Sequence, residues 1–189
     1  MLSTTLLMDL LAIPSPTYGE QQKTDFIESW IANALPMAMI DRIGNNLMVD
    51  ISAKKADVPV LVFVGHTDTV PDFFTPYKTD DRMYGAGASD MQSGLACLLA
   101  FVANHHNTLI EHYQVKLIVY DKEENTPLHQ NGLNECIQQR PTFFDGIDVA
   151  IVGEPTDNAI QLGCVGSIHA TVTVQGRAAH SARPWHGEN

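Results

Sequence analysis

Side chains that can bind a metal or move a proton follow several apolar stretches of this sequence. The stretches Val58–Val64, Val115–Tyr120 and Val149–Val152 have the composition of strands buried on both faces. The carboxyl ends of such strands meet at one edge of an α/β sheet, where ligands bind. A glycine-rich loop, Gly85–Gly87, leads to one further acid. We therefore expect one shared site made of His66, Asp68, Asp90, Glu123, Glu124 and Glu154.

So many acids in one crevice would repel one another unless cations neutralise them. Imidazole combined with carboxylates suits zinc or a similar transition metal, whereas a magnesium site is more often made of oxygen ligands alone. The net charge of −11, from 11 Lys and Arg against 22 Asp and Glu, is compatible with metal binding.

Each of these motifs also has an ordinary structural explanation. Asp68 could cap a turn, and Asp90 could cap a helix. The pair Glu123–Glu124 could belong to a solvated loop, and Glu154 could be a surface residue. Taken alone, no single motif distinguishes a metal site from these explanations. The metal hypothesis rests on the repetition of such motifs at successive strand ends.

The elements that must position these residues alternate along the chain. Apolar stripes predict helices near residues 6–11, 26–35, 91–104 and 132–139. Asn45–Asn46 resembles the turn of a hairpin between Met39–Ile43 and Leu47–Ile51. Together with the three apolar strands, this order predicts an α/β fold whose largely parallel sheet is flanked by helices.

The pattern changes near residues 163–166. In Ser167–Gln175, apolar and polar residues alternate, as in a half-exposed antiparallel strand. We predict a metal-binding domain over 1–165 and the start of a smaller antiparallel domain over 166–189. Because the sequence stops within this second segment, we expect a C-terminally truncated chain.

The composition excludes several classes of protein. A chain of 189 residues, 44% hydrophobic and 17% charged, can bury a core and is not disordered. The acidic surplus argues against nucleic acid and anionic membrane as partners. No apolar run reaches the roughly 18 residues that a membrane span needs. Three separated cysteines indicate reduced thiols in a cytoplasmic protein and no disulfide framework.

One further histidine stands in a basic turn. His180 lies in Gly176–Pro184, together with Arg177 and Arg183. Such a cluster can bind an anionic substrate or an oxyanion. A plain surface loop is the alternative.

Taken in order, these motifs resemble the di-zinc aminoacylase/carboxypeptidase metallopeptidase family. The motifs are Gly65–Pro71, Gly85–Met91, Glu123–Glu124, Gly153–Thr156 and Gly176–Ser181. Three segments are most similar to the succinyl-diaminopimelate desuccinylase branch of that family. They are Tyr120–Glu124, Leu162–Gly166 and His180–Asn189. Acetylornithine deacetylases and carboxypeptidases or dipeptidases of the family share much of the pattern.

The resemblance implies a role for each matching residue. His66 and Glu154 would hold one zinc, Glu124 would hold a second, and Asp90 would bridge both. Cobalt is an alternative metal. The second zinc of the family also takes a histidine that lies beyond the last residue of this chain. We therefore expect the second site to be incomplete here, with about one zinc bound per chain and poor hydrolysis.

The catalytic roles also follow from the resemblance. The resemblance also implies that residues 1–165 form the catalytic domain and that residues 166–189 begin a smaller α+β lid domain. Glu123 would be the general base, Asp68 would orient His66, and His180 would stabilise the oxyanion from the lid. Arg183 and Asn189 would contact the substrate, a small N-acyl amino acid. The family also implies a homodimer that forms through the lid.

Two other functions are compatible with these residues. The first is a non-catalytic metal-binding protein on the same scaffold, although such a protein has no need for a base at Glu123. The second is a magnesium-dependent phosphotransferase. The sequence has no phosphate-binding glycine-rich loop with a lysine, and His66 suits zinc better.

Overall fold

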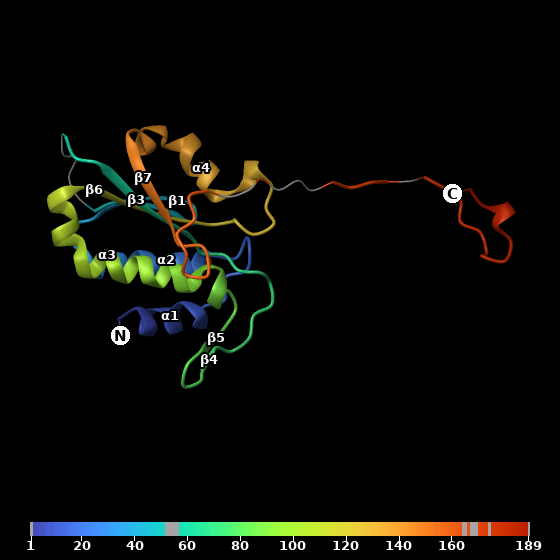
Figure 1. The fold of residues 1–189 in the computed structure, drawn as a ribbon, viewed down its shortest axis with the longest axis horizontal. Coiled ribbons are helices and arrows are strands. Elements are labelled where there is room, and N and C mark those ends of the chain that lie inside the picture. The colour runs from blue at the N-terminus through green and yellow to red at the C-terminus, as the bar shows by residue number, and fades with distance from the viewer. Residues whose placement is uncertain (1, 52–56, 164–165, 167–169, 174, 189) are drawn as a thin grey trace. The chain divides into compact units, whose positions relative to one another are not determined.

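The structure is a computed structural model, and it describes residues 2–51, 57–163, 166, 170–173 and 175–188. It separates into two compact units, Met1–Asp157 and Asn158–Asn189, which are described one at a time (Figure 1). The predicted domain boundary at residues 165/166 stays a prediction. Within the described residues, every helix falls short of the length or apolar character that a membrane span requires.

The first unit is built on a mixed sheet of five strands in the order β1-β2-β6-β3-β7. The bounds are β1 Met39–Ile43, β2 Asn46–Asp50, β3 Val60–His66, β6 Gln114–Tyr120 and β7 Ile147–Val152. β3 pairs in parallel with both β6 and β7, while β2 pairs antiparallel with β1 and with β6. The carboxyl ends of β3, β6 and β7 therefore meet at one edge, as the predicted α/β fold requires.

Helices cover both faces of this sheet. α1 (Leu2–Ala12), α2 (Gln21–Ala34) and α3 (Ser93–His112) lie on one side, and α4 (Gly132–Gln139) lies on the other (Figure 1). The first layer packs apolar side chains such as Leu10, Ile27 and Leu99 against the sheet residues Val49 and Leu117. Burial of each such side chain is worth about 1.5–3 kcal/mol.

The other face has a smaller core. There Val62, Val64 and Ile118 pack with Leu133 of α4 and with Phe143 of the 3₁₀ segment Pro141–Phe144.

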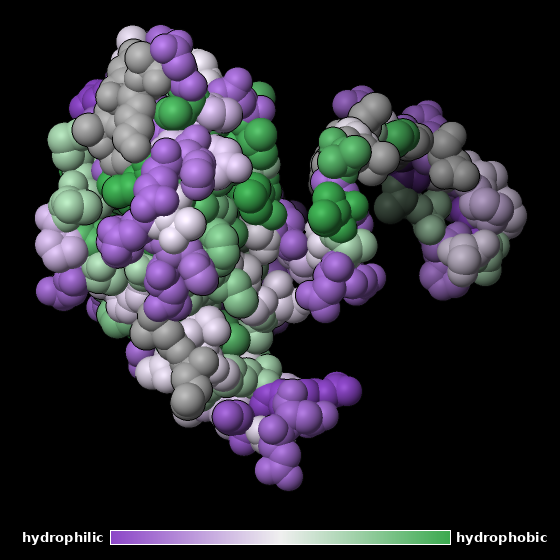
Figure 2. All heavy atoms as spheres, turned by 60° about the vertical axis from the view of Figure 1, so that its left-hand side comes forward, coloured by the Kyte–Doolittle hydropathy of each residue, from purple (hydrophilic) through white to green (hydrophobic). Residues whose placement is uncertain are grey.

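Further short elements are β4 (Tyr77–Lys78), β5 (Met83–Tyr84), a π-helical segment Ala88–Gln92 and the 3₁₀ segments Leu128–Gln130 and Pro184–His186. Figure 2 shows hydrophilic side chains gathered at the tip of the β4–β5 hairpin, where Asp81 and Arg82 are exposed.

β7 differs from the sequence prediction. Its composition predicts a strand buried on both faces, but Val149 is 51% exposed and Ile151 is 42% exposed. Among the described residues, β7 is an edge strand that pairs only with β3. A stretch rich in β-branched residues favours a strand. Whether the side chains of that strand are buried depends on which other parts of the chain pack against it.

The second unit contains a closed loop. Arg177 N donates to Glu188 O, and Glu188 N donates to Arg177 O, both at 3.0 Å. The strand predicted over Ser167–Gln175 lies partly outside the described residues. Its described part, residues 170–173 and 175, forms no strand.

Candidate metal centre

Three separate segments bring acidic side chains to one histidine at the edge of the sheet. His66 is the last residue of β3, and its Nε2 lies 3.2 Å from Asp90 Oδ1. The same nitrogen lies 3.7 Å from Glu154 Oε1 and 3.9 Å from Glu123 Oε2. Glu123 follows β6 and Glu154 follows β7, so the parallel pairing of these strands with β3 creates the cluster.

Three of these residues are close enough to share one ion. One ligand atom from each of His66, Asp90 and Glu124 lies within 4.8 Å of the others. Glu154 stands beside this group through its contact with His66. The structure thus gathers all four side chains that the sequence analysis expects to bind metal, while the assignment of each to a particular ion stays a prediction.

Asp68 holds two parts of the centre together. Its Oδ1 accepts a hydrogen bond from Glu123 N and its Oδ2 accepts one from Glu124 N, both at 2.9 Å. Its Oδ1 also lies 3.3 Å from His66 Nδ1, and its Oδ2 accepts from Thr17 Oγ1 at 3.0 Å. Burial alone would raise the pKa of Asp68, but these hydrogen bonds lower it below its usual value. Asp68 therefore stays ionised and fixes both His66 and the loop after β6.

The imidazole of His66 is oriented to offer one nitrogen to a cation. Nδ1 faces only oxygens, the backbone carbonyl of Asp68 at 3.0 Å and its carboxylate, so it carries a proton. Nε2 faces the carboxylates. Burial alone would lower the pKa of His66, but the hydrogen bond to Asp68 and the charges of Asp68, Glu154 and Glu123 raise it to about 9.

The carboxylates around Nε2 also repel one another. Burial and the nearby Asp90 and Glu123 raise the pKa of Glu154 to about 7, although the charge of His66 opposes this change. Burial and the charges of Asp90 and Glu123 likewise raise the pKa of Glu124. A divalent cation would relieve this repulsion, and one imidazole with several carboxylates is a donor set that zinc accepts. The residues of the centre therefore fit such a metal.

The loop that carries Glu154 packs tightly on the start of α3. A Cβ atom at Gly94 would overlap the carbonyl oxygen of Gly153, the residue before Glu154. Only glycine therefore permits this approach. The sequence analysis missed this role, although a glycine inside a helical pattern is a signal of close packing.

Glu20 is a second residue that the sequence analysis missed. Its side chain is fully buried, and Oε1 accepts hydrogen bonds from Tyr18 N at 2.8 Å and Lys122 N at 3.3 Å. Glu20 thereby ties the loop before α2 to the residue that precedes Glu123. Only the long-range contact identifies this role, since an acid near a helix start usually interacts with the helix dipole.

The remaining predicted site residues belong to the second unit or lie outside the description. His180 and Arg183 are exposed residues of the closed loop, and Ala182 N donates to His180 Nδ1 at 3.1 Å. Their roles toward substrate stay predictions. Asn189 lies outside the described residues.

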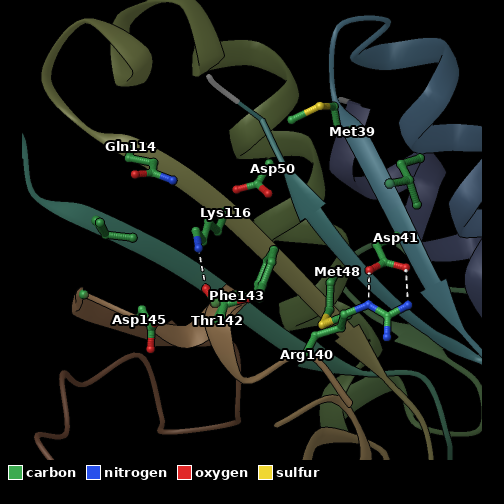
Figure 3. Close-up of a pocket in the computed structure, with 13 residues that line it drawn as sticks. Met39, Asp41, Met48, Asp50, Gln114, Lys116, Arg140, Thr142, Phe143 and Asp145 are labelled. Atoms are coloured by element: carbon green, nitrogen blue, oxygen red, sulfur yellow. Dashed lines mark hydrogen bonds and ion pairs between the residues drawn. The ribbon is translucent and has the colours of Figure 1, made fainter. Parts of the chain in front are cut away.

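A groove of about 790 Å³ lies elsewhere on the first unit, between the sheet and the segment Pro141–Phe144 (Figure 3). Within it, Arg140 Nε lies 2.7 Å from Asp41 Oδ2, and the Lys116 ammonium contacts both the ring and the carbonyl oxygen of Phe143. None of the candidate metal ligands lines this groove. Its charged residues hold the sheet and the 3₁₀ segment together.

Replacing Asp68 with Asn is expected to weaken both the fold and the metal centre. An amide presents an N–H group to one of the backbone N–H donors, so a buried hydrogen bond is lost at a cost of about 1–3 kcal/mol. Metal affinity should fall about 10–100-fold, as for other groups that orient a ligand. Urea unfolding and cobalt titration measure the two effects. Asp81→Asn, at the exposed hairpin tip, is the control, and an unchanged metal affinity in Asp68→Asn would contradict the orienting role.

Comparison with known proteins places this chain in a family. Residues 62–186 match the family described as Peptidase family M20/M25/M40. The chain is 38% identical over 188 residues to succinyl-diaminopimelate desuccinylase of Corynebacterium glutamicum, which covers 97% of this chain and 50% of that protein. The chain thus spans about half the length of the curated relatives it matches.

Solved structures share the fold at low sequence identity. A tripeptidase from Staphylococcus aureus superposes with a TM-score of 0.66 at 20% identity, over 98% of this chain and 52% of that one. The YXEP protein of Bacillus subtilis, described as a dinuclear metal-binding peptidase, superposes with a TM-score of 0.55 at 14% identity, over 79% of this chain and 41% of that one.

Proposed function

Because the chain belongs to peptidase family M20/M25/M40, we propose that the whole protein is a metal-dependent hydrolase of N-acyl amino acids. One observation carries the proposal: ligand atoms of His66, Asp90 and Glu124 lie within 4.8 Å of one another. The desuccinylase relative, with 38% identity, favours N-succinyl-diaminopimelate as the substrate.

The centre supplies ligands for two metal ions in this proposal. His66, Asp90 and Glu154 would hold one ion, and Glu124 together with Asp90 would hold the other. A bound divalent ion polarises the substrate carbonyl and makes water a better nucleophile at neutral pH. The dinuclear relative supports two sites, and zinc is the ion that the imidazole and carboxylate donors favour, with cobalt as a substitute.

Glu123 moves the proton in this proposal. Its Oε2 lies 3.9 Å from His66 Nε2, so the carboxylate reaches the ligand cluster, while Asp68 holds its backbone. The carboxylate takes a proton from the attacking water and returns it to the leaving amine. The products are succinate and a free amino group.

The basic loop of the second unit is assigned to the substrate. His180 would stabilise the oxyanion, and Arg183 and Asn189 would bind substrate carboxylates, since charge-assisted hydrogen bonds suit such groups. As in the sequence analysis, the lid would also form a homodimer. These assignments rest on the resemblance of the motifs.

A substrate panel tests the proposed activity. The whole protein, stripped of metal and reloaded with zinc, is assayed with N-succinyl-diaminopimelate, N-acetylornithine and a dipeptide. We expect the succinyl substrate to give the highest kcat/KM and chelation to abolish turnover. A preference for N-acetylornithine or the dipeptide would move the protein to another activity of the family. Turnover that survives complete metal removal would overturn the proposal.

Metal binding is also expected to stabilise the 189-residue chain. A ligand that binds only the folded state at about 100 times its Kd adds about 2.7 kcal/mol of stability. Thermal unfolding with zinc or cobalt should therefore give a higher Tm than unfolding with a chelator. Calcium, which prefers six to eight oxygen ligands, is the control ion. Equal shifts with calcium would indicate general screening of the acidic cluster.

A further inference from the structure

A lysine is buried beneath the metal centre. Lys23 occupies the same buried stripe of α2 as Ile27 and Ile31, four and eight residues further on, and its side chain is only 1% exposed. No ion pair among the described residues includes it. A buried ammonium costs free energy unless hydrogen bonds compensate it, so its contacts are informative.

The hydrogen bond of Lys23 leads directly toward the centre. Lys23 Nζ donates to Gln92 Oε1 at 3.2 Å, and Gln92 Nε2 donates to Thr67 O at 3.3 Å. An ammonium can only donate, so Gln92 must turn its oxygen to Lys23 and its NH₂ group to Thr67. The lysine and the Thr67 carbonyl together thus select one of the two orientations of a fully buried amide.

Gln92 connects the two segments that carry the ligands. It ends the π-helical segment that contains Asp90, and its backbone N donates to Gly87 O at 2.9 Å. Thr67 stands between His66 and Asp68. The link from Lys23 through Gln92 therefore fastens the Asp90 segment to the end of β3. Asp68 also acts on Lys23 through its charge, which counters the lowering of the Lys23 pKa to about 7 by burial.

We infer that Lys23 is a positioning residue, whose buried ammonium orients the Gln92 amide and thereby holds Asp90 in register with His66. Its hydrogen bond among the described residues is to Gln92, so it acts on the ligand segment through that amide. The inference adds a positioning residue to the proposed metal centre. Two measurements test it, hydrogen exchange and Co²⁺ affinity, and only the second depends on the proposed function.

The first readout is amide hydrogen exchange of the metal-free chain, measured by mass spectrometry. In Lys23→Met, amides of residues 87–92 should exchange at least about tenfold faster. The Gln92 oxygen then has no ammonium donor, so its amide is held less firmly against Thr67 and the segment opens more easily. Ile31→Val, in the same buried stripe, is the matched control and should leave this segment unchanged. Unchanged exchange in Lys23→Met overturns the inference. A rise spread evenly over β3 and α3 also overturns it, because general destabilisation would then be the cause.

The second readout is the affinity for Co²⁺, followed by its absorption spectrum. Lys23→Met should bind Co²⁺ about 10–100-fold more weakly, the range for groups that orient metal ligands. The exchanged double variant Lys23→Gln with Gln92→Lys restores an ammonium–amide pair and should recover the affinity to within about threefold of the original chain. A double variant as weak as Lys23→Met overturns the inference, because altered packing would then explain the loss.

A replacement variant and the unaltered chain keep the outcomes separate. If Lys23→Met does not fold, Lys23→Gln replaces it. A glutamine keeps a donor for Gln92, but because it can also accept a hydrogen bond it no longer fixes the orientation of the Gln92 amide. The same changes are expected. Failure of the unaltered chain to bind Co²⁺ counts against the proposed function, whereas unchanged exchange at residues 87–92 counts against the role of Lys23.

Discussion

Replacing Glu123 with Gln is expected to reduce kcat of the whole protein about 1,000-fold or more while the metal content stays constant. Glutamine keeps the size of the side chain and its backbone hydrogen bond to Asp68, but it cannot accept a proton from water. General acid–base catalysis contributes about 10²–10⁴-fold in enzymes. Metal analysis and steady-state kinetics on the same samples measure the two properties.

Glu124→Gln is the matched comparison for this experiment. Glu124 supplies a ligand atom to the group with His66 and Asp90, so its amide variant should lose metal affinity. The two neighbouring glutamates therefore have opposite expected signatures. Loss of metal from Glu123→Gln, with metal retained by Glu124→Gln, would mean that the base and the ligand are exchanged.

His66→Asn is expected to show the largest loss of metal affinity, more than about 100-fold. Residues that only orient a ligand cost about 10–100-fold when they are replaced, and loss of a ligand itself should exceed that range. Asparagine can still donate to the carbonyl of Asp68, as His66 Nδ1 does. It cannot place an imidazole nitrogen among Asp90, Glu123 and Glu154, and those acids then repel one another without a nitrogen ligand. Titration with Co²⁺ and metal analysis after dialysis give the measurement.

His105→Ala is the control, because His105 is exposed on α3 and lies outside the ligand group. Its metal affinity should match that of the unaltered chain. A His66→Asn variant that retains metal would show that the carboxylates bind the ion without imidazole, and it would favour a hard cation over zinc.

The order of the elements was predictable from local sequence patterns. The helix over Gly132–Gln139 and the hairpin strand Met39–Ile43 have the predicted bounds, and the other strands of the five-stranded sheet differ from the predictions by two residues or fewer at each end. The short strands β4 and β5 were not predicted. The predicted helix over Met91–Asn104 instead begins at Ser93 and continues to His112. Asp90 and Met91 have non-helical dihedral angles, which suit the approach of Asp90 to His66 and have no signal in the apolar periodicity.

The clustering of the candidate ligands was also predictable, because each one follows a strand or a glycine-rich loop. Parallel pairing then brings His66, Glu123 and Glu154 together without any further information. Coverage was not predictable, as β7 shows: its sequence is that of a buried strand, yet its side chains are exposed. Burial of a strand depends on elements that local patterns do not specify.

The sequence by itself determined the types of the main elements of the first unit and the set of residues that cluster in the candidate metal centre, since periodicity and strand-end position are properties of neighbouring residues. Only the tertiary structure decided how those residues are held. Asp68 bonds to Glu124 across 56 positions, Lys23 to Gln92 across 69, and Glu20 to Lys122 across 102. A lysine in an apolar stripe and a glutamate before a helix acquire their roles only when folding excludes water and leaves each a single set of partners.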